Sequence, residues 1–317
     1  MIKPGAVLAA FLLIAGILQP QSAHAAAPGK LWQPLGGRAQ IPLWPRNPAA
    51  GTPEADGPEG ANLDPFKTEG RYEAMVFNVT QPTMTIYRPE TRKSGAAILV
   101  LPGGGYRKLA IDLEGSEVCD WATALGMTCV VVKYRVPQTW WHDDCKCQIE
   151  PNPFLPLQDA QRAIRLLRQR AVSLGIDPHK IGVIGFSAGG HLAAAMSNAT
   201  GGSYAPVDTA DRLSARPDFA MPLYPGHLWA DHDAALLPFD HVVAGCPPTF
   251  LVQAEDDPVD NVRNSIAYFL ALQAMKIPVE MHIYAHGGHA FALRNTGQPI
   301  SGWPALAAKW LHTIGVL

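Results

Sequence analysis

The chain has 317 residues, of which 48 % are hydrophobic and 16 % are charged, and its formal net charge at pH 7 is -2. This composition is typical of a globular chain with enough apolar residues for a sizeable core. It argues against a nucleic-acid-binding protein, which would carry a basic excess, and it contains no charge run typical of a disordered tail.

The first 25 residues differ from the rest of the chain. Lys3 precedes an apolar run over residues 6–18, which is too short to cross a bilayer, and Ala23-His24-Ala25 places small residues at a cleavage position. We therefore expect residues 1–25 to be a secretory signal peptide that is cleaved after Ala25. The mature protein is expected to be secreted or periplasmic, without membrane attachment.

The next segments predict an arm and the first strands of a sheet. Residues 26–70 are rich in Pro and Gly and lack periodicity, so we expect an extended N-terminal arm, followed by a single domain over residues 71–317. Residues 76–80 and 83–88 predict a hairpin-like pair of strands at a sheet edge. Apolar runs at 96–101 and 127–134 predict buried strands, with a helix at 113–125 between them.

The second half of the chain continues the alternation of helices and strands. Residues 136–156, with Trp140 and Trp141, interrupt the pattern and are typical of a loop at the rim of a site. An amphipathic helix is predicted at 157–174, and its arginines are expected to face solvent. Strands at 181–184, 219–223, 249–252 and 279–284 alternate with helices at 191–197, 262–275 and 305–314. This pattern predicts an α/β fold with a mostly parallel central sheet and helices on both faces.

Five cysteines leave one over, and export would allow disulfides to form. Cys119 and Cys129 fall in apolar helix and strand patterns, so we expect them to be buried thiols. Cys145 and Cys147 lie in a polar insertion, where we expect one of them to form a disulfide. The sequence identifies neither the partner in that disulfide nor whether Cys246 is paired. The Cys-x-Cys pair lacks a second ligand pair for a metal site.

The strongest chemical signal is Gly185-Phe186-Ser187-Ala188-Gly189, which lies between an apolar strand and an alanine-rich helix. Strand, sharp turn and helix form the setting that a Gly-x-Ser-x-Gly nucleophile elbow requires. The small residues at 185, 188 and 189 make room for a strained backbone at the serine. We therefore predict that Ser187 is a nucleophile at the carboxyl edge of the sheet.

A serine nucleophile needs a base, and the base needs an orienting carboxylate. Two loops that follow downstream strands provide candidates. The loop at 253–260 contains four possible acids: Glu255, Asp256, Asp257 and Asp260. The loop at 285–291 contains His286 and His289, and we favour His289 because it lies further from the strand end and has glycines beside it.

The run Pro102-Gly103-Gly104-Gly105-Tyr106 follows an early strand and is suited to an oxyanion hole. We predict that the N–H groups of Gly104, Gly105 and Ala188 are the donors. The run lacks both the Lys-Ser/Thr of a P-loop and the spacing of a dinucleotide fingerprint. His286 and His289 lack a clear third metal ligand. We therefore expect no metal and no organic cofactor.

The chain resembles the α/β-hydrolase superfamily, and within it the secreted esterases related to acetyl xylan esterases and to bacterial carbohydrate acetyl and feruloyl esterases. The matching stretches run in order over most of the chain from about residue 75 onward. They lie at residues 78–83, 102–106, 110–115, 133–137, 157–160, 185–190, 216–219, 256–259 and 287–291.

The resemblance implies an α/β-hydrolase fold and a Ser-His-Asp triad. It assigns the acid to Asp257, before the proline of Asp-Asp-Pro-Val, and the base to His289 of Gly-Gly-His. Its implied activity is hydrolysis of carboxylic esters, with acetylated plant polysaccharides of the xylan type as substrate. Two departures stand out: Asp260 lies where such loops often carry Pro or Val and is an alternative acid, and the insertion at 140–147 is long.

Aromatic and basic residues near the predicted site are candidates for binding a sugar. They are Tyr106, Arg107, Trp140, Trp141 and Tyr224. Rival interpretations are a feruloyl or general short-chain carboxylesterase, a serine peptidase, and a non-catalytic carbohydrate-binding protein. The last would be expected to lack a member of the triad, whereas all three are present here.

Overall fold

The structure is a computed structural model that describes the chain from residue 31 onward with short internal gaps. The described residues are 31–46, 51–55, 57–68, 70–91, 93–137, 141–142, 147–148, 154–237 and 240–317. The helices are α1 (Glu117–Ala124), α2 (Phe154–Gln169), α3 (Ala171–Leu174), α4 (Ala188–Asn198), α5 (Arg263–Ala274) and α6 (Trp303–Thr313). None of the helices within these ranges is long and apolar enough to cross a lipid bilayer.

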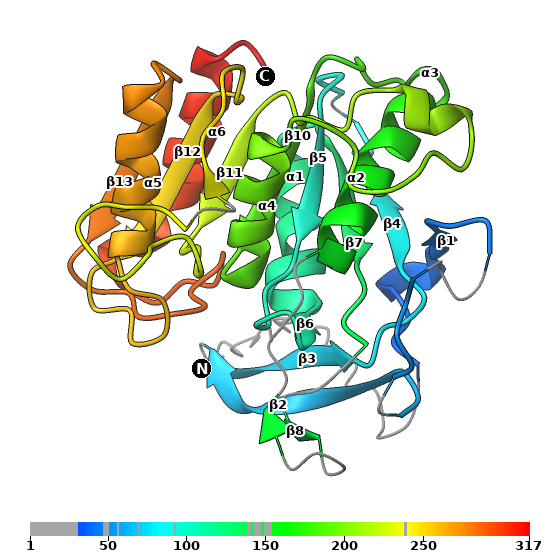
Figure 1. Cartoon of the computed structure of the whole chain (residues 1–317), viewed down its shortest axis with the longest axis horizontal. Coiled ribbons are helices and arrows are strands. Elements are labelled where there is room, and N and C mark those ends of the chain that lie inside the picture. The colour runs from blue at the N-terminus through cyan, green and yellow to red at the C-terminus, as the bar shows by residue number, and fades with distance from the viewer. Residues whose placement is uncertain are drawn as a thin grey trace, which may run out of the picture.

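An eight-stranded sheet organises the molecule (Figure 1), in the order β1-β4-β7-β5-β10-β11-β12-β13. From β7 to β13 all neighbours are parallel, whereas β4 runs antiparallel to β7 and β1 runs antiparallel to β4. The carboxyl ends of the parallel strands therefore meet at one edge, where open α/β sheets bind ligands. Its strands are β1 (Ile41–Pro42), β4 (Thr83–Tyr87), β5 (Ala97–Leu101), β7 (Thr128–Lys133), β10 (Ile181–Phe186), β11 (Ala220–Leu223), β12 (Thr249–Ala254) and β13 (Val279–Tyr284).

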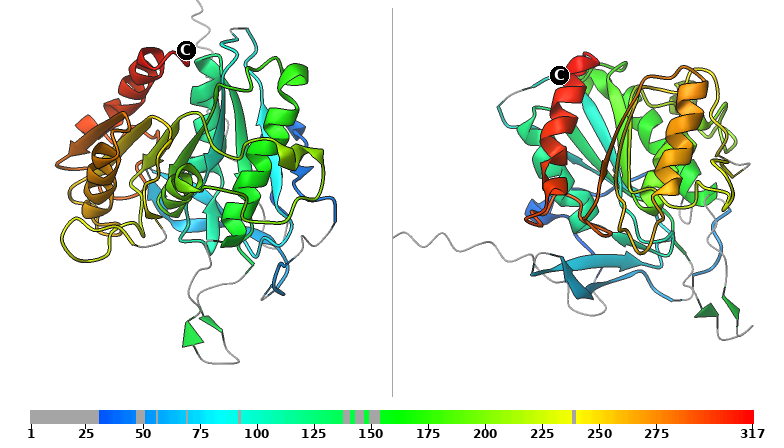
Figure 2. Two further views of the ribbon diagram at one scale, coloured as in Figure 1. Left: turned by 45° about the horizontal axis from the view of Figure 1, so that its top comes forward. Right: turned by 90° about the vertical axis from the view of Figure 1, so that its left-hand side faces the viewer.

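Helices cover both faces of this sheet, as the sequence predicted. Helices α1 and α6 share one face, where the rings of Trp121 and Trp303 lie 5.8 Å apart. Helices α2, α4 and α5 cover the other, and Figure 2 shows α5 and α6 on opposite sides of the strands. Every residue of β5, β7 and β10 is buried, because strands covered on both faces have no solvent side.

A small three-stranded sheet lies beside the carboxyl edge of the large one (Figure 1), in the order β2-β3-β6. Its strands are β2 (Gly60–Thr68), β3 (Arg71–Phe77) and β6 (Lys108–Ala110). The predicted hairpin of residues 76–80 with 83–88 is wrong, because β3 pairs with β2 and β6 whereas β4 pairs with β7. Asn78 has a φ of 53° and Val79 bridges to Val136, so the chain changes sheets between β3 and β4.

Two further segments bear on the sequence predictions. Residues 60–68, expected to belong to the extended arm, form strand β2. The insertion that follows β7 contains a two-stranded hairpin of β8 (Trp141–His142) and β9 (Cys147–Gln148). This hairpin lies on the same side of the large sheet as the small sheet (Figures 1 and 2). The predicted signal peptide lies outside the described residues.

The arginines of α2 do not form the solvated face that the sequence predicted. Arg162 is only 2 % exposed, and its guanidinium pairs with Asp208 and lies 2.9 Å from Asp211. Arg168 pairs with Asp218 at 2.9 Å. These acids belong to the segment between α4 and β11, which folds back over the helix. The arginines therefore join two parts of the chain that a helical pattern alone cannot bring together.

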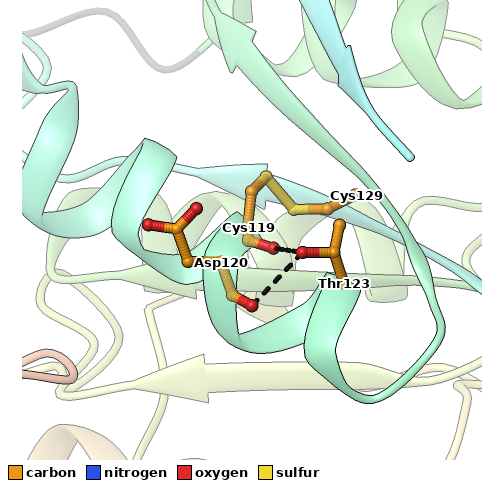
Figure 3. The surroundings of a disulfide bond; sticks show 4 residues. All are labelled: Cys119, Asp120, Thr123 and Cys129. Carbon is orange, nitrogen blue, oxygen red and sulfur yellow. Dashed lines mark hydrogen bonds between the residues drawn. A yellow bond between two sulfur atoms is a disulfide. The ribbon is translucent and has the colours of Figure 1, made fainter. Parts of the chain in front are cut away.

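The cysteines on α1 and β7 form a disulfide, which corrects the expectation of thiols (Figure 3). Cys119 and Cys129 are fully buried with their Cα atoms 5.2 Å apart, within the range that a disulfide bridges. Helix α1 packs directly on β7, so burial of the two apolar patterns brings the sulfurs together. Cys246 is a buried free thiol. The side chains of Cys145 and Cys147 lie outside the described residues.

The turn between β10 and α4 is closely packed backbone. Ser187 sits there with φ 52° and ψ -121°, a conformation that costs free energy for a side chain with a Cβ. A Cβ on Gly185 would lie 1.9 Å from the carbonyl oxygen of Gly189, and one on Gly189 would lie 2.0 Å from that of Leu101. Both glycines are therefore sterically required, and the predicted elbow is confirmed.

We expect removal of the disulfide to destabilise the fold. Replacing both Cys119 and Cys129 by serine should lower the free energy of unfolding by about 2–4 kcal/mol, because the unfolded chain regains conformational freedom. Urea unfolding followed by tryptophan fluorescence measures the change, and the wild-type protein in reductant is the matched comparison. A midpoint that does not respond to reductant would contradict the assignment.

We also expect Gly189→Ala to destabilise the elbow. The new Cβ would meet backbone atoms of β5, which have little freedom to move, so the loss should be about 2 kcal/mol or more. Gly201→Ala is the control, since nothing lies within 4 Å of a Cβ built there, and it should change stability by less than about 1 kcal/mol. Equal unfolding midpoints for the two variants would refute the steric argument.

Candidate functional site

The three predicted triad residues meet at the carboxyl edge of the large sheet. His289, on the loop after β13, has its Nε2 3.1 Å from the Oγ of Ser187. Its Nδ1 lies 2.8 Å from Oδ2 of Asp257, on the loop after β12. Nucleophile, base and orienting acid thus form one hydrogen-bonded row, which is the geometry that activates a serine hydroxyl.

Of the acids that the sequence left open, Asp257 is the one on His289 Nδ1. Its side chain is fully buried, Oδ1 accepts the backbone N–H groups of Val259 and Asp260, and the Gln253 amide donates to Oδ2 at 3.1 Å. These bonds fix the carboxylate in place, so it can hold the imidazole in one orientation.

Asp256 has a different role in the same loop. Its carboxylate accepts the backbone N–H groups of Gly287 and Gly288 and lies 3.1 Å from Nδ1 of the exposed His286. The hydrogen bond from Gly288, helped by the others, holds the pKa of Asp256 below its usual range. Asp256 and His286 therefore shape the loop that carries His289 and do not touch Ser187.

Three carboxylates act on the charge state of His289. Burial disfavours its protonation, but the hydrogen bond and charge of Asp257, together with the charges of Asp260 and Glu114, outweigh burial and raise the pKa of His289. A base with a raised pKa accepts the serine proton more readily. It is also already protonated, and therefore inactive as a base, at a higher pH than an ordinary histidine.

Glu114 is a site residue that sequence reasoning did not single out. It lies in a helical turn before α1, where its buried carboxylate accepts Gly103 N–H at 2.7 Å and the Tyr224 hydroxyl at 2.9 Å. Burial raises the pKa of Glu114 to about 7. The signal available in the sequence was an acid on the apolar face of the predicted helix, four residues before Val118, where a charged group rarely lies without a partner.

The glycine loop lies against the nucleophile. A Cβ on Gly103 would fall 2.9 Å from Cβ of Ser187, and the small sheet holds the loop through the bond from Ala110 N–H to Gly103 O. Glu114 occupies the N–H of Gly103. Within the described part of the chain, the N–H groups of Gly104 and Gly105 donate to no backbone or side-chain acceptor. These are two of the predicted oxyanion donors, and Ala188 begins α4 beside them, where helix N–H groups have no intrahelical partner.

The residues predicted to bind a sugar are placed unevenly. Tyr224 is fully buried beneath the triad, with its ring 5.1 Å from that of His289, so it supports the base and offers no face to a substrate. Tyr106 is 6 % exposed and its hydroxyl lies 2.5 Å from Nδ1 of His191. Both assignments to sugar stacking are therefore corrected. Arg107 is half-buried beside the loop, and the side chains of Trp140 and Trp141 lie outside the described residues.

The sequence of this chain is similar to those of known esterases. Residues 84–209 match the BD-FAE family. An acetylxylan esterase of Xylanibacter ruminicola is 29 % identical over 66 % of this chain, which spans only 43 % of that relative's length. An ethyl acetate hydrolase of Pseudomonas putida is 25 % identical over 65 % of this chain and 70 % of its own length.

A solved structure matches nearly the whole chain. The acetyl ester-xyloside bifunctional hydrolase from Caldicellulosiruptor lactoaceticus superposes with a TM-score of 0.66. It is 32 % identical, and the match covers 88 % of this chain and 97 % of that one. On the strength of this nearly complete match, the chain belongs to the α/β-hydrolases, among proteins similar to acetylxylan esterases.

Proposed function

We propose that the protein is a carboxylic ester hydrolase that releases short acyl groups, acetyl above all, by a Ser187-His289-Asp257 triad. The observation that carries the proposal is the hydrogen-bonded row from Ser187 Oγ through His289 to Asp257, at 3.1 and 2.8 Å. The esterase relatives and the unengaged N–H groups of the glycine loop support it.

The residues perform the reaction in two halves. Ser187 Oγ attacks the ester carbonyl carbon while His289 Nε2 takes its proton, and Asp257 stabilises the imidazolium. The carbonyl oxygen becomes an oxyanion that accepts hydrogen bonds from Gly104, Gly105 and Ala188 N–H groups. His289 then protonates the departing alcohol. In the second half His289 deprotonates a water that attacks the acyl-serine, and it returns this proton to Ser187 Oγ as the acid leaves.

For the substrate we propose acetylated carbohydrate of the xylan type. Support comes from two similar proteins, which are named as an acetylxylan esterase and as an acetyl ester-xyloside hydrolase. A feruloyl or general short-chain ester is the competing substrate class, and comparison of acyl groups separates the two.

We further propose that the protein acts outside the cytoplasm, in the periplasm or after secretion. The apolar N-terminal run and the small residues before position 26 support export. The Cys119–Cys129 disulfide supports it independently, because such bonds persist in oxidising compartments.

Triad variants test the proposal on p-nitrophenyl acetate, p-nitrophenyl octanoate, methyl ferulate and acetylated xylan. Ser187→Ala should lower kcat by about 10⁴-fold or more, and Asp257→Asn by about 10⁴-fold, because the imidazole loses its orienting partner. Asp256→Asn is the matched control and should cost about tenfold or less, since Asp256 only shapes the loop. Release of acid by Ser187→Ala at the wild-type rate would overturn the nucleophile.

The pH profile tests the charges around His289. Only neutral imidazole accepts the serine proton, so kcat/KM should fall on acidification with a midpoint above the ordinary histidine pKa of about 6.5. Glu114, with a pKa of about 7, is partly ionised near this midpoint and favours the imidazolium, so Glu114→Gln should move the midpoint to lower pH by less than about one unit. Glu255→Gln, an exposed acid, should leave it in place. A shift of the Glu114→Gln midpoint to higher pH would contradict the account.

A further inference from the structure

A second carboxylate reaches the nucleophile from the same loop as Asp257. Oδ2 of Asp260 lies 3.1 Å from Ser187 Oγ and 3.8 Å from His289 Nε2. Its backbone is fixed, because its N–H donates to Asp257 Oδ1 and its carbonyl accepts the Gln253 amide. Asp257 and Asp260 therefore stand at opposite nitrogens of one imidazole, and only Asp257 can orient the ring through Nδ1.

The side chain of Asp260 is held at this position by close packing. Its carboxylate lies over Gly226, where a Cβ would come within 2.3 Å of Oδ1. The side chain is only 14 % exposed. Burial raises the pKa of this carboxyl, against the charges of His289 and His227. A carboxylate so little exposed needs a hydrogen-bond donor, and the Ser187 hydroxyl is within reach of it, at the same distance as from His289 Nε2.

Turnover removes this donor. A serine hydroxyl has one proton, so it cannot serve His289 and Asp260 at once, and attack requires the proton to point at Nε2. In the acyl-enzyme the hydroxyl no longer exists. Asp260 Oδ2 then lacks its partner, and an unpaired, mostly buried carboxylate oxygen is costly. A substrate that brings its own O–H donor removes that cost.

The position of Asp260 indicates where that donor must lie. His289 Nε2 has to reach the alcohol oxygen of the ester in order to protonate it. Because Oδ2 of Asp260 is 3.8 Å from Nε2, it lies within reach of atoms next to that oxygen. A hydroxyl on the neighbouring carbon, as in a partly acetylated sugar, falls within its reach, whereas a simple alkyl or nitrophenyl alcohol offers none.

We propose that Asp260 selects esters of polyhydroxylated alcohols by accepting a hydrogen bond from the hydroxyl next to the esterified oxygen. This inference rests on the proposed esterase function and adds the specificity determinant to it. It assigns to Asp260 a role in recognising the alcohol, separate from the orienting role of Asp257.

The test compares two substrates that differ only in the donor. One is a methyl pentopyranoside with a single acetyl group and free neighbouring hydroxyls, and the other is the same compound with those hydroxyls replaced by hydrogen, which removes the donor without adding bulk. We expect the wild-type protein to prefer the first in kcat/KM by about tenfold or more, the worth of one hydrogen bond to a charged group. In Asp260→Ala the ratio of the two values should fall towards one.

Asp260→Asn keeps the volume of the side chain and is the second variant, in case Asp260→Ala folds poorly. The ratio of its two kcat/KM values should also fall, because the acceptor loses its charge. Glu255→Ala removes an exposed carboxylate from the same loop and should keep the wild-type ratio. A ratio that is unchanged in both Asp260 variants, or a wild-type ratio near one, would overturn the inference alone. Wild-type protein inactive on p-nitrophenyl acetate as well would overturn the proposed function, and this inference with it.

Discussion

The contact between the nucleophile turn and the end of strand β5 sets the geometry of everything around it. Gly189 lies against the carbonyl of Leu101, and Gly103 lies against the Cβ of Ser187, so two backbone segments touch with no side chain between them. This contact places the glycine loop beside the serine before any substrate arrives. A site assembled from backbone in this way needs little reorganisation when charge develops, which is where electrostatic catalysis is most effective.

Negative charge is distributed around His289 rather than concentrated in its triad partner. Asp257 binds Nδ1, Asp260 lies near Nε2, and Glu114 sits below with hydrogen bonds to the glycine loop and to Tyr224. All three favour the imidazolium that forms during the reaction. Glu114 accepts hydrogen bonds from the glycine loop proposed to bind the oxyanion and from Tyr224, which packs on His289. One buried carboxyl therefore connects the proposed oxyanion hole with the catalytic base.

The local features of the fold and the site could be predicted from the sequence. Features that depend on contacts between distant parts of the chain were seen only in the structure. The elbow, the parallel strands and the closing helix follow from apolar runs and glycine spacing, and they were predicted nearly residue by residue. Strand β2 was missed because apolar and polar residues do not alternate along it. What makes it a strand is its pairing with β3, which a local pattern does not reveal. The α2 arginines were misjudged because Asp208 and Asp211 lie more than forty residues away along the chain.

The choice among four acids shows the same limit in the site. Asp256, Asp257 and Asp260 are within five residues of one another, and residue type does not separate them. Only the turn after β12 decides which carboxylate meets Nδ1, which meets the glycines of the next loop and which meets the serine. Resemblance to known esterases selected Asp257, whereas the roles of Asp256 and Asp260 required coordinates.

Under the export that we propose, the short spacing of the disulfide has a consequence for the order of events. Its two cysteines are ten residues apart and lie in the first half of the chain, ahead of β10 and of all three triad residues. Closing so short a loop costs less chain entropy than closing a longer one. In a chain that is exported from its N-terminus, α1 and β7 can therefore be joined covalently while the segments that carry Ser187, Asp257 and His289 have yet to emerge. Strand β7, which pairs with β4 and β5 from earlier in the chain, would then already be anchored to its helix when β10 emerges.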